Sequence, residues 1–252
     1  MKIFNTILFL FLLSLGAGRG LNAQIVNIES DRLETEKLGW AGFIDFGLDF
    51  VKEERDIVSL QNMVHIQFTT EKNLYLFLNR IDLIKTDGES LQNSLLEHLR
   101  FNRDIGSIFR AEIFGQIQYN RIIRLKMRIL SGAGLRILFL DKEWIKMNIG
   151  ALYMFEHEEI VDGEINRFHR MSDYLSFSLK ILSNLSLGST AYYQPRLDNF
   201  KDWRISSESN LLFKISSKCS LNVQFNILHD SRPPAGVVKT IYSLKNGLRL
   251  EF

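Results

Sequence analysis

KNGLRLEF, residues 245–252, alternates apolar and charged side chains up to its last residue, which is aromatic. Leu248, Leu250 and Phe252 share one parity, whereas Arg249 and Glu251 share the other. Successive side chains of a β-strand point to opposite faces, so this strand has one apolar and one charged face. The pattern predicts a C-terminal strand whose two faces meet different surroundings.

A strand of this kind resembles the last strand of outer-membrane β-barrel proteins. The resemblance implies that its apolar face meets lipid and that the segment marks the chain for the barrel insertion machinery. The predicted C-terminal insertion signal consists of Lys245, Gly247, Leu250 and Phe252. An ordinary terminal strand is the competing interpretation.

The N-terminal region has the three parts of a secretory signal peptide. Lys2 precedes the apolar run Ile7–Leu15, and Leu21-Asn22-Ala23 follows as a cleavage site. We predict cleavage after Ala23, with an uncleaved anchor helix as the alternative. The only cysteine, Cys219, leaves no lipid-attachment site and no internal disulfide. The predicted domains are a signal peptide (1–23), a periplasmic segment (24–37) and an outer-membrane β-barrel (38–252).

Alternation along the rest of the chain predicts the other strands. Trp40–Phe50 and Phe109–Tyr119 have one apolar and one polar face, whereas the segments at 74–84 and 95–103 have mixed faces. Short links should alternate with longer ones, as in bacterial barrels. The predicted longer loops are Lys85–Asn93, Glu156–Asn166, Gln194–Asp202 and His229–Lys239.

These features predict an all-β fold, a transmembrane antiparallel up-and-down β-barrel of about 12 strands, preceded by a cleaved signal peptide. Only a closed barrel or a helix satisfies its own backbone in lipid, and no later stretch is long and apolar enough for a helix. A soluble two-sheet sandwich or lipocalin-like cup is the structural alternative. The predicted location is the bacterial outer membrane.

Several stretches resemble the YdiY-like family of salt-induced outer-membrane proteins, a family of unknown function. The resemblance implies an outer-membrane barrel with no established activity and supplies no catalytic residues. The resembling stretches include Phe114–Arg121 (FGQIQYNR), Gly150–Glu156 (GALYMFE), Arg170–Leu175 (RMSDYL), Tyr192–Pro195 (YYQP) and Asp230–Val237 (DSRPPAGV).

Charged residues collect on the parity that should face the barrel interior. The candidates for lining it are Arg110, Glu112, Arg124, Lys126, Arg128, Arg136, Lys146, Arg170, Arg204 and Glu208. The basic series from Arg124 to Arg136 could line an anion-selective pore. Buried charges must be paired, and both signs are available, so an interior closed by ion pairs is the interpretation we favour.

Two motifs invite other functions. His229 and Ser231 could form the His-x-Ser pair of an outer-membrane lipid hydrolase, but a turn before Pro233 explains them more simply. The acidic stretch Glu156–Glu164 is expected to be an external loop that could hold cations. We predict no enzymatic activity, no metal site and no cofactor.

The balance of charge excludes one class of partner. A net charge of +2 without a sustained basic run gives no support to nucleic-acid binding. The expected partners are outer-membrane lipid, lipopolysaccharide and the barrel insertion machinery, and the expected state is a monomer. The predicted role is structural or related to envelope stress, with a plugged or narrow polar interior; the alternatives are a small anion channel and, more remotely, a lipid hydrolase.

Overall fold

The computed structural model describes residues 38–52, 56–86 and 89–251. The predicted signal peptide, the segment 24–37 and Phe252 lie outside the described residues. No helix among the residues that the structure describes is long and apolar enough to cross a membrane.

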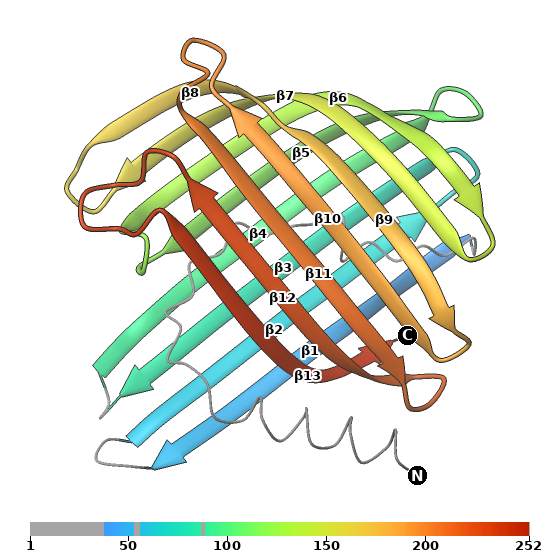
Figure 1. Ribbon diagram of the computed structural model, residues 1–252, viewed down its shortest axis with the longest axis horizontal. Coiled ribbons are helices and arrows are strands. Elements are labelled where there is room, and N and C mark those ends of the chain that lie inside the picture. The colour runs from blue at the N-terminus through green and yellow to red at the C-terminus, as the bar shows by residue number, and fades with distance from the viewer. Residues whose placement is uncertain (1–37, 53–55, 87–88, 252) are drawn as a thin grey trace.

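The described chain consists of β-strands joined in antiparallel order (Figure 1). The strands are β1 (Gly39–Lys52), β2 (Asp56–Thr69), β3 (Asn73–Thr86), β4 (Glu89–Asp104), β5 (Phe109–Asn120), β6 (Leu125–Lys142), β7 (Ile145–Ile160), β8 (Ile165–Met171), β9 (Asp173–Leu182), β10 (Leu185–Pro195), β11 (Trp203–Lys214), β12 (Cys219–Asp230) and β13 (Thr240–Glu251).

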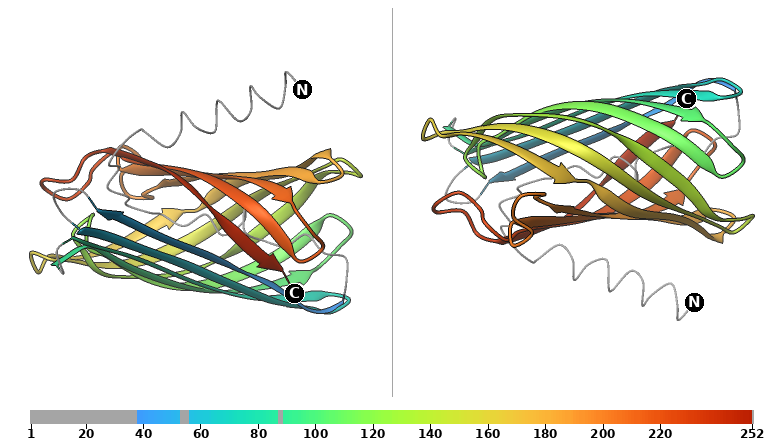
Figure 2. Two further views of the ribbon diagram at one scale, coloured as in Figure 1. Left: turned by 90° about the horizontal axis from the view of Figure 1, so that it is seen from below. Right: turned by 90° about the horizontal axis from the view of Figure 1, so that it is seen from above.

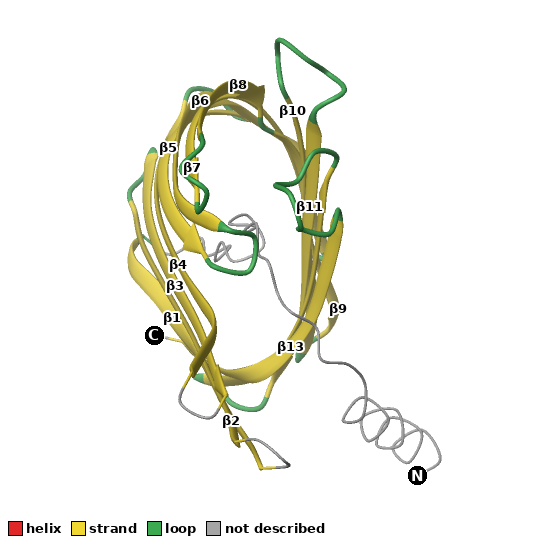
Figure 3. Cartoon of the chain, turned by 90° about the vertical axis from the view of Figure 1, so that its left-hand side faces the viewer, coloured by secondary structure: helices red, strands yellow, loops and turns green. Residues whose placement is uncertain are grey.

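The ring contains twelve strand positions, because β8 and β9 occupy one position together. β7 pairs with β8 along one half of its length and with β9 along the other. Ser172 lies between them, and its backbone N–H still donates to the Leu152 carbonyl at 2.7 Å. β1 pairs with β13 and closes the ring, which Figure 3 shows close to end-on. The predicted fold, an all-β antiparallel barrel of about 12 strands, is confirmed.

The two faces of the barrel wall are inverted relative to those of a water-soluble protein. Leu99, Ile113 and Leu248 point outwards and are 62%, 58% and 51% exposed. Glu156 and Arg170 point inwards and are 0% and 1% exposed. Because alternation places neighbouring residues on opposite faces, the outer surface is largely apolar, whereas the interior holds the charged residues together with buried apolar ones such as Leu78 and Met154.

Figure 2 shows the tilted strands of the two walls. The links that join the strands differ in length between the two ends of the barrel. We call one end the turn end; its links are 70–72, 105–108, 143–144, 183–184 and 215–218. We call the other the loop end; its described links are 121–124, 161–164, 196–202 and 231–239.

Two predicted loops at the loop end are wrong. β3 continues to Thr86 and β4 begins at Glu89, so the predicted loop Lys85–Asn93 is mostly strand. The predicted loop Glu156–Asn166 shrinks to residues 161–164, because β7 continues to Ile160. The acidic residues of this stretch do not mark a solvated loop, because Glu156 and Glu158 point into the barrel and pair there with arginines such as Arg128.

Candidate functional site

The most densely charged part of the interior lies between the middle of the barrel and the loop end. Its members come from five strands and one link. We call them the charged cluster; they are Arg128, Glu156, Glu158, Arg170, Asp202, Arg204 and Asp230.

Glu156 on β7 is the centre of the charged cluster. Its carboxylate pairs with Arg128 on β6, with an Nε–Oε1 distance of 2.9 Å. Arg170 on β8 donates from Nε to the other oxygen, Oε2, at 2.7 Å. Arg204 on β11 donates from Nη1 to Oε1. One carboxylate with no solvent exposure therefore joins guanidinium groups from three strands.

The other acids of the cluster balance those arginines. Glu158 accepts hydrogen bonds from Arg128 and, at 3.2 Å, from Arg204. Asp230 on β12 accepts from Nε of Arg204 at 2.7 Å. Asp202, which precedes β11, accepts from Nη2 of Arg170 at 3.0 Å. Charge-assisted bonds of this geometry offset the cost of removing the charges from water only when they are nearly all formed, as they are here.

A second network lies nearer the turn end. Tyr174 on β9 donates its hydroxyl to Oε2 of Glu112 on β5 at 2.8 Å. The same carboxylate has Arg100 at 3.6 Å and Arg136 at 3.9 Å. Arg136 also donates to the side-chain oxygen of Asn148 at 3.0 Å. Both signs of charge thus meet in this layer as well.

Apolar packing closes the interior at the loop end. Ile123, in the link before β6, and Leu125, the first residue of β6, pack against Leu228 of β12 and Ile241 of β13. β6 lies far from β12 and β13 in the strand order, so this contact crosses the barrel. The 231–239 link supports it from outside through Val237.

The structure places six of the sequence-predicted lining residues in the interior. They are Glu112, Arg128, Arg136, Arg170, Arg204 and Glu208, each 6% exposed or less. Two others lie near the turn end, where Arg110 pairs with Asp104 and Lys146 lies 3.9 Å from Asp141.

Arg124 and Lys126 do not lie in the interior. Arg124 has a positive φ of 56° in the link before β6 and pairs with Asp162. Lys126 pairs with Glu159 at 2.5 Å on the outer side of the wall, with 61% of its side chain exposed. A register shift between Leu125 and Met127 interrupts the alternation, so the parity that fits Arg128 does not extend to these two residues.

Several interior charges were not among the predicted lining residues. They include Arg80, Asp82, Arg100, Glu158, Asp202 and Asp230. Arg80, Asp82 and Arg100 lie in the segments whose faces look mixed in sequence, because leucines such as Leu78 also point inwards. Asp202 lies in a link, where side chains do not alternate between two faces, so its inward position could not be predicted from the sequence.

The 196–202 link carries a pair of its own at the loop end. Arg196 donates two hydrogen bonds to the Asp198 carboxylate, from Nε at 2.9 Å and from Nη2 at 2.6 Å. These bonds lower the pKa of Asp198 below its ordinary value. Arg196 also bonds Asp202, so the link is tied to the charged cluster.

The His229–Ser231 pair has a different use from the one a hydrolase would need. His229 bonds the Thr240 hydroxyl through Nδ1 at 2.8 Å and stacks on Trp203. The Ser231 hydroxyl accepts the backbone N–H of Trp203 at 2.8 Å and donates to the Lys201 carbonyl. Both side chains hold strand ends and the link in place.

Comparison with known proteins gives one family and several folds of similar shape. Residues 44–252 match the family model described as "Protein of unknown function, DUF481". No curated protein matches the chain. The chain is similar to the NanC porin structure at 8% identity, covering 83% of this chain and 97% of that one, with a TM-score of 0.49. It is similar to the KdgM porin at 10% identity (84% and 99% covered, TM-score 0.48) and to the translocator domain of autotransporter NalP from Neisseria meningitidis at 10% identity (89% and 92% covered, TM-score 0.49).

Proposed function

The chain belongs to the DUF481 family of proteins of unknown function, which is the YdiY-like family expected from the sequence, and we propose that it is an integral outer-membrane barrel with a closed, non-conducting interior. Its role is structural, as a component of the cell envelope. The expected partners are outer-membrane lipid, lipopolysaccharide and the insertion machinery that reads the C-terminal strand.

The inverted wall supports the membrane location. Large apolar side chains such as Leu99 and Ile113 would be unfavourable in water over so wide a surface. In lipid the same side chains are well solvated, and a closed ladder of strands leaves few backbone groups unpaired. Alternation of apolar outward and polar inward residues is the pattern of membrane barrels.

The arrangement around Glu156 carries the proposal of a closed interior. Its carboxylate holds arginines from β6, β8 and β11 together, so a solute moving along the barrel would have to separate them. Removing one partner from such a buried group costs about 3–5 kcal/mol. Arg128 and Arg136, which would have lined an anion pathway, are engaged with acids or amides instead.

Planar-bilayer recording tests the proposal directly. The full chain, refolded and shown to be folded by its heat-dependent mobility on a gel, should insert and give no steady current above the baseline. A reproducible anion-biased current that weakens in Arg128→Glu would overturn it and assign the alternative function, a small anion channel. Failure of the folded chain to enter lipid vesicles would overturn the membrane location.

A further inference from the structure

The outer wall of the barrel carries a small group of polar side chains where its surroundings are apolar. We compared the outward-facing residues in the middle parts of β1 to β5, which are the ranges 42–48, 60–66, 77–83, 95–99 and 111–117. All of them are apolar or glycine except Asn62 on β2, Asn79 on β3 and Glu97 on β4. We call these three residues the polar patch.

Alternation shows that the patch faces outwards. Glu97 lies between Leu96 and His98, which point into the barrel and are 4% and 1% exposed. On its own face Glu97 is exposed and has Leu95 and Leu99 as neighbours, with exposed fractions of 36% and 62%. The two asparagines likewise alternate with buried residues. The patch therefore belongs to the surface that meets lipid in the proposed membrane location.

The three side chains are neighbours on that surface. Asn79 and Glu97 lie directly opposite each other on β3 and β4. Asn62 lies opposite Ile81, which is two residues from Asn79, so Asn62 is the diagonal neighbour of Asn79. Directly opposite and diagonal residues on one face of a sheet are close enough for their side chains to interact. The patch is thus one continuous polar area across three strands.

A row of aromatic side chains near the turn end gives the depth of the patch. Trp40 contacts Phe68 with ring centroids 4.9 Å apart, and Tyr75 contacts Phe101 at 5.1 Å. All four rings lie on the outward parity of β1 to β4, and aromatic rows of this kind mark the membrane interface of barrels.

The patch lies deep in the membrane relative to that row. Along their strands, Glu97 and Asn79 are each four residues from the aromatic row, and Asn62 is six residues from it. With about 3.3 Å per residue and a strand tilt of about 40°, these separations place the patch about 10–15 Å from the interface. The apolar band of a barrel is about 25 Å tall, so the patch lies near its middle.

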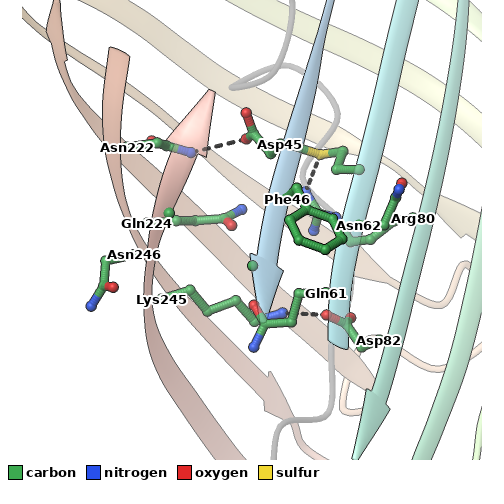
Figure 4. A pocket seen from close by; sticks show the side chains of 13 residues that line it. Asp45, Phe46, Gln61, Asn62, Arg80, Asp82, Asn222, Gln224, Lys245 and Asn246 are labelled. Atoms are coloured by element: carbon green, nitrogen blue, oxygen red, sulfur yellow. Dashed lines mark hydrogen bonds and ion pairs between the residues drawn. The ribbon is translucent and has the colours of Figure 1, made fainter. Parts of the chain in front are cut away.

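The patch differs from the polar groups inside the barrel because its side chains have no partners. Figure 4 shows interior bonds close to Asn62, namely Lys245 with Asp82 at 2.7 Å and Asn222 with Asp45 at 3.1 Å. In the part of the chain that the structure describes, no side-chain hydrogen bond or ion pair involves any of the three patch residues. Lipid chains offer neither donors nor acceptors at this depth, so the partners must come from another protein surface.

We propose that the polar patch is the contact face of a homodimer, in which a second copy of this chain packs against β2, β3 and β4 within the membrane. A two-fold axis along the membrane normal, placed between β3 and β4, sets Asn79 of each copy opposite the partner's Glu97. The asparagine amide donates and the carboxylate accepts. The two residues differ in height by about 3 Å, because they lie across tilted strands, and their side chains span that difference.

Self-complementarity is the reason for choosing a second copy as the partner. A two-fold interface requires one surface to pair with itself, and a donor beside an acceptor on neighbouring strands meets this requirement. Leu95 and Leu99 surround the carboxylate with apolar surface that packs around the polar contact. The dimer replaces the monomer expected from the sequence, and the inference rests on the proposed membrane location.

Energy transfer between labelled full-length chains in lipid vesicles tests the dimer. Cys219 is the only cysteine, so each unfolded chain takes one donor or one acceptor dye before it is refolded into vesicles of phosphatidylethanolamine and phosphatidylglycerol. We expect energy transfer that falls as lipid dilutes the protein. Asn79→Leu and Glu97→Leu should each raise the protein-to-lipid ratio needed for half-maximal transfer by about tenfold.

The matched control is Asn246→Leu. Asn246 is an exposed asparagine on the outward parity of β13, three of the twelve strand positions away from β3, so it faces a different direction. This variant should dissociate at the same ratio as the wild type. Heat-dependent mobility on a gel confirms that each variant is folded.

Disulfide trapping tests the orientation of the two copies. Ile81 and Leu95 lie opposite each other on the outward face beside the patch, so cysteines there leave the patch intact. In a Cys219→Ser background, chains carrying Ile81→Cys are mixed with chains carrying Leu95→Cys and oxidised. The proposed axis brings residue 81 of one copy to residue 95 of the other, so mass spectrometry should find the mixed disulfide in excess of either self-linked product.

Three results would overturn the homodimer face. The first is the absence of energy transfer at every protein-to-lipid ratio. The second is a dimer whose dissociation is unchanged in both Asn79→Leu and Glu97→Leu. The third is a self-linked disulfide that equals or exceeds the mixed one. A folded wild-type chain that never enters the vesicles would instead contradict the proposed function.

Discussion

Arg80 on β3 and Glu208 on β11 approach to 3.4 Å between Nη1 and Oε2, although β2, β1, β13 and β12 separate their strands in the ring. Their side chains are 4% and 0% exposed. The two walls of the barrel are therefore close enough for ordinary side chains to meet across the interior. Together with the charged cluster and the apolar closure at the loop end, this contact divides the interior into small compartments.

Glu156→Gln should destabilise the barrel strongly, because Arg128, Arg170 and Arg204 would share a neutral amide in place of a carboxylate. We expect the free energy of unfolding, measured by urea titration in lipid vesicles, to fall by about 3–5 kcal/mol. The control is Glu159→Gln, which breaks an exposed pair with Lys126 and should cost less than about 1 kcal/mol. Equal losses in the two variants would show that burial of the cluster does not matter.

Leu125→Ser should open the apolar closure at the loop end. Leu125 is 1% exposed and contacts side chains of the opposite wall, and a serine would leave space and attract water. Planar-bilayer recording should detect brief current steps that the wild type lacks. Ile165→Ser, at an exposed position at the same end, is the matched control and should stay silent. A silent Leu125→Ser barrel that remains folded would mean that the deeper ion pairs alone close the interior.

Gly150→Ala should be poorly tolerated because Tyr174 packs directly on the glycine. A Cβ at Gly150 would lie 2.0 Å from the Tyr174 ring, which would have to move away from Glu112. We expect a loss of about 1–3 kcal/mol in the free energy of unfolding. Gly115→Ala is the control, because a Cβ there meets nothing within 4 Å. The packing argument fails if the two variants unfold at the same urea concentration.

Leu99→Arg separates a lipid-facing surface from a water-facing one. Leu99 points outwards from β4 and is 62% exposed, so in water an arginine would be nearly neutral. In a bilayer the substitution should cost about 2–4 kcal/mol near the midplane. Val161→Arg, in a link at the loop end, should change the unfolding free energy by no more than about 0.5 kcal/mol. A neutral Leu99→Arg would contradict the membrane location.

The alternation of side chains allowed most of the barrel wall to be predicted. Leu248 and Leu250 point outwards and Arg249 points inwards, as the terminal segment predicts. The prediction was weaker where the interior contains apolar residues, as at Leu76 and Leu78, because both faces of the strand then look alike. The prediction that Arg124 and Lys126 face the interior is wrong, because a register shift between Leu125 and Met127 changes which residues point inwards. The alternation of apolar and polar residues does not reveal this shift.

Alternation along the chain was enough to predict an antiparallel barrel with a largely apolar exterior and inward-facing charges, because strand alternation is a local property of neighbouring residues. The pairing of those charges, by contrast, depends on the folded barrel. Glu156 pairs with Arg204, and Arg80 pairs with Glu208, across strands that are distant in sequence. Ring closure and strand tilt set which inward side chains lie at the same height along the barrel axis.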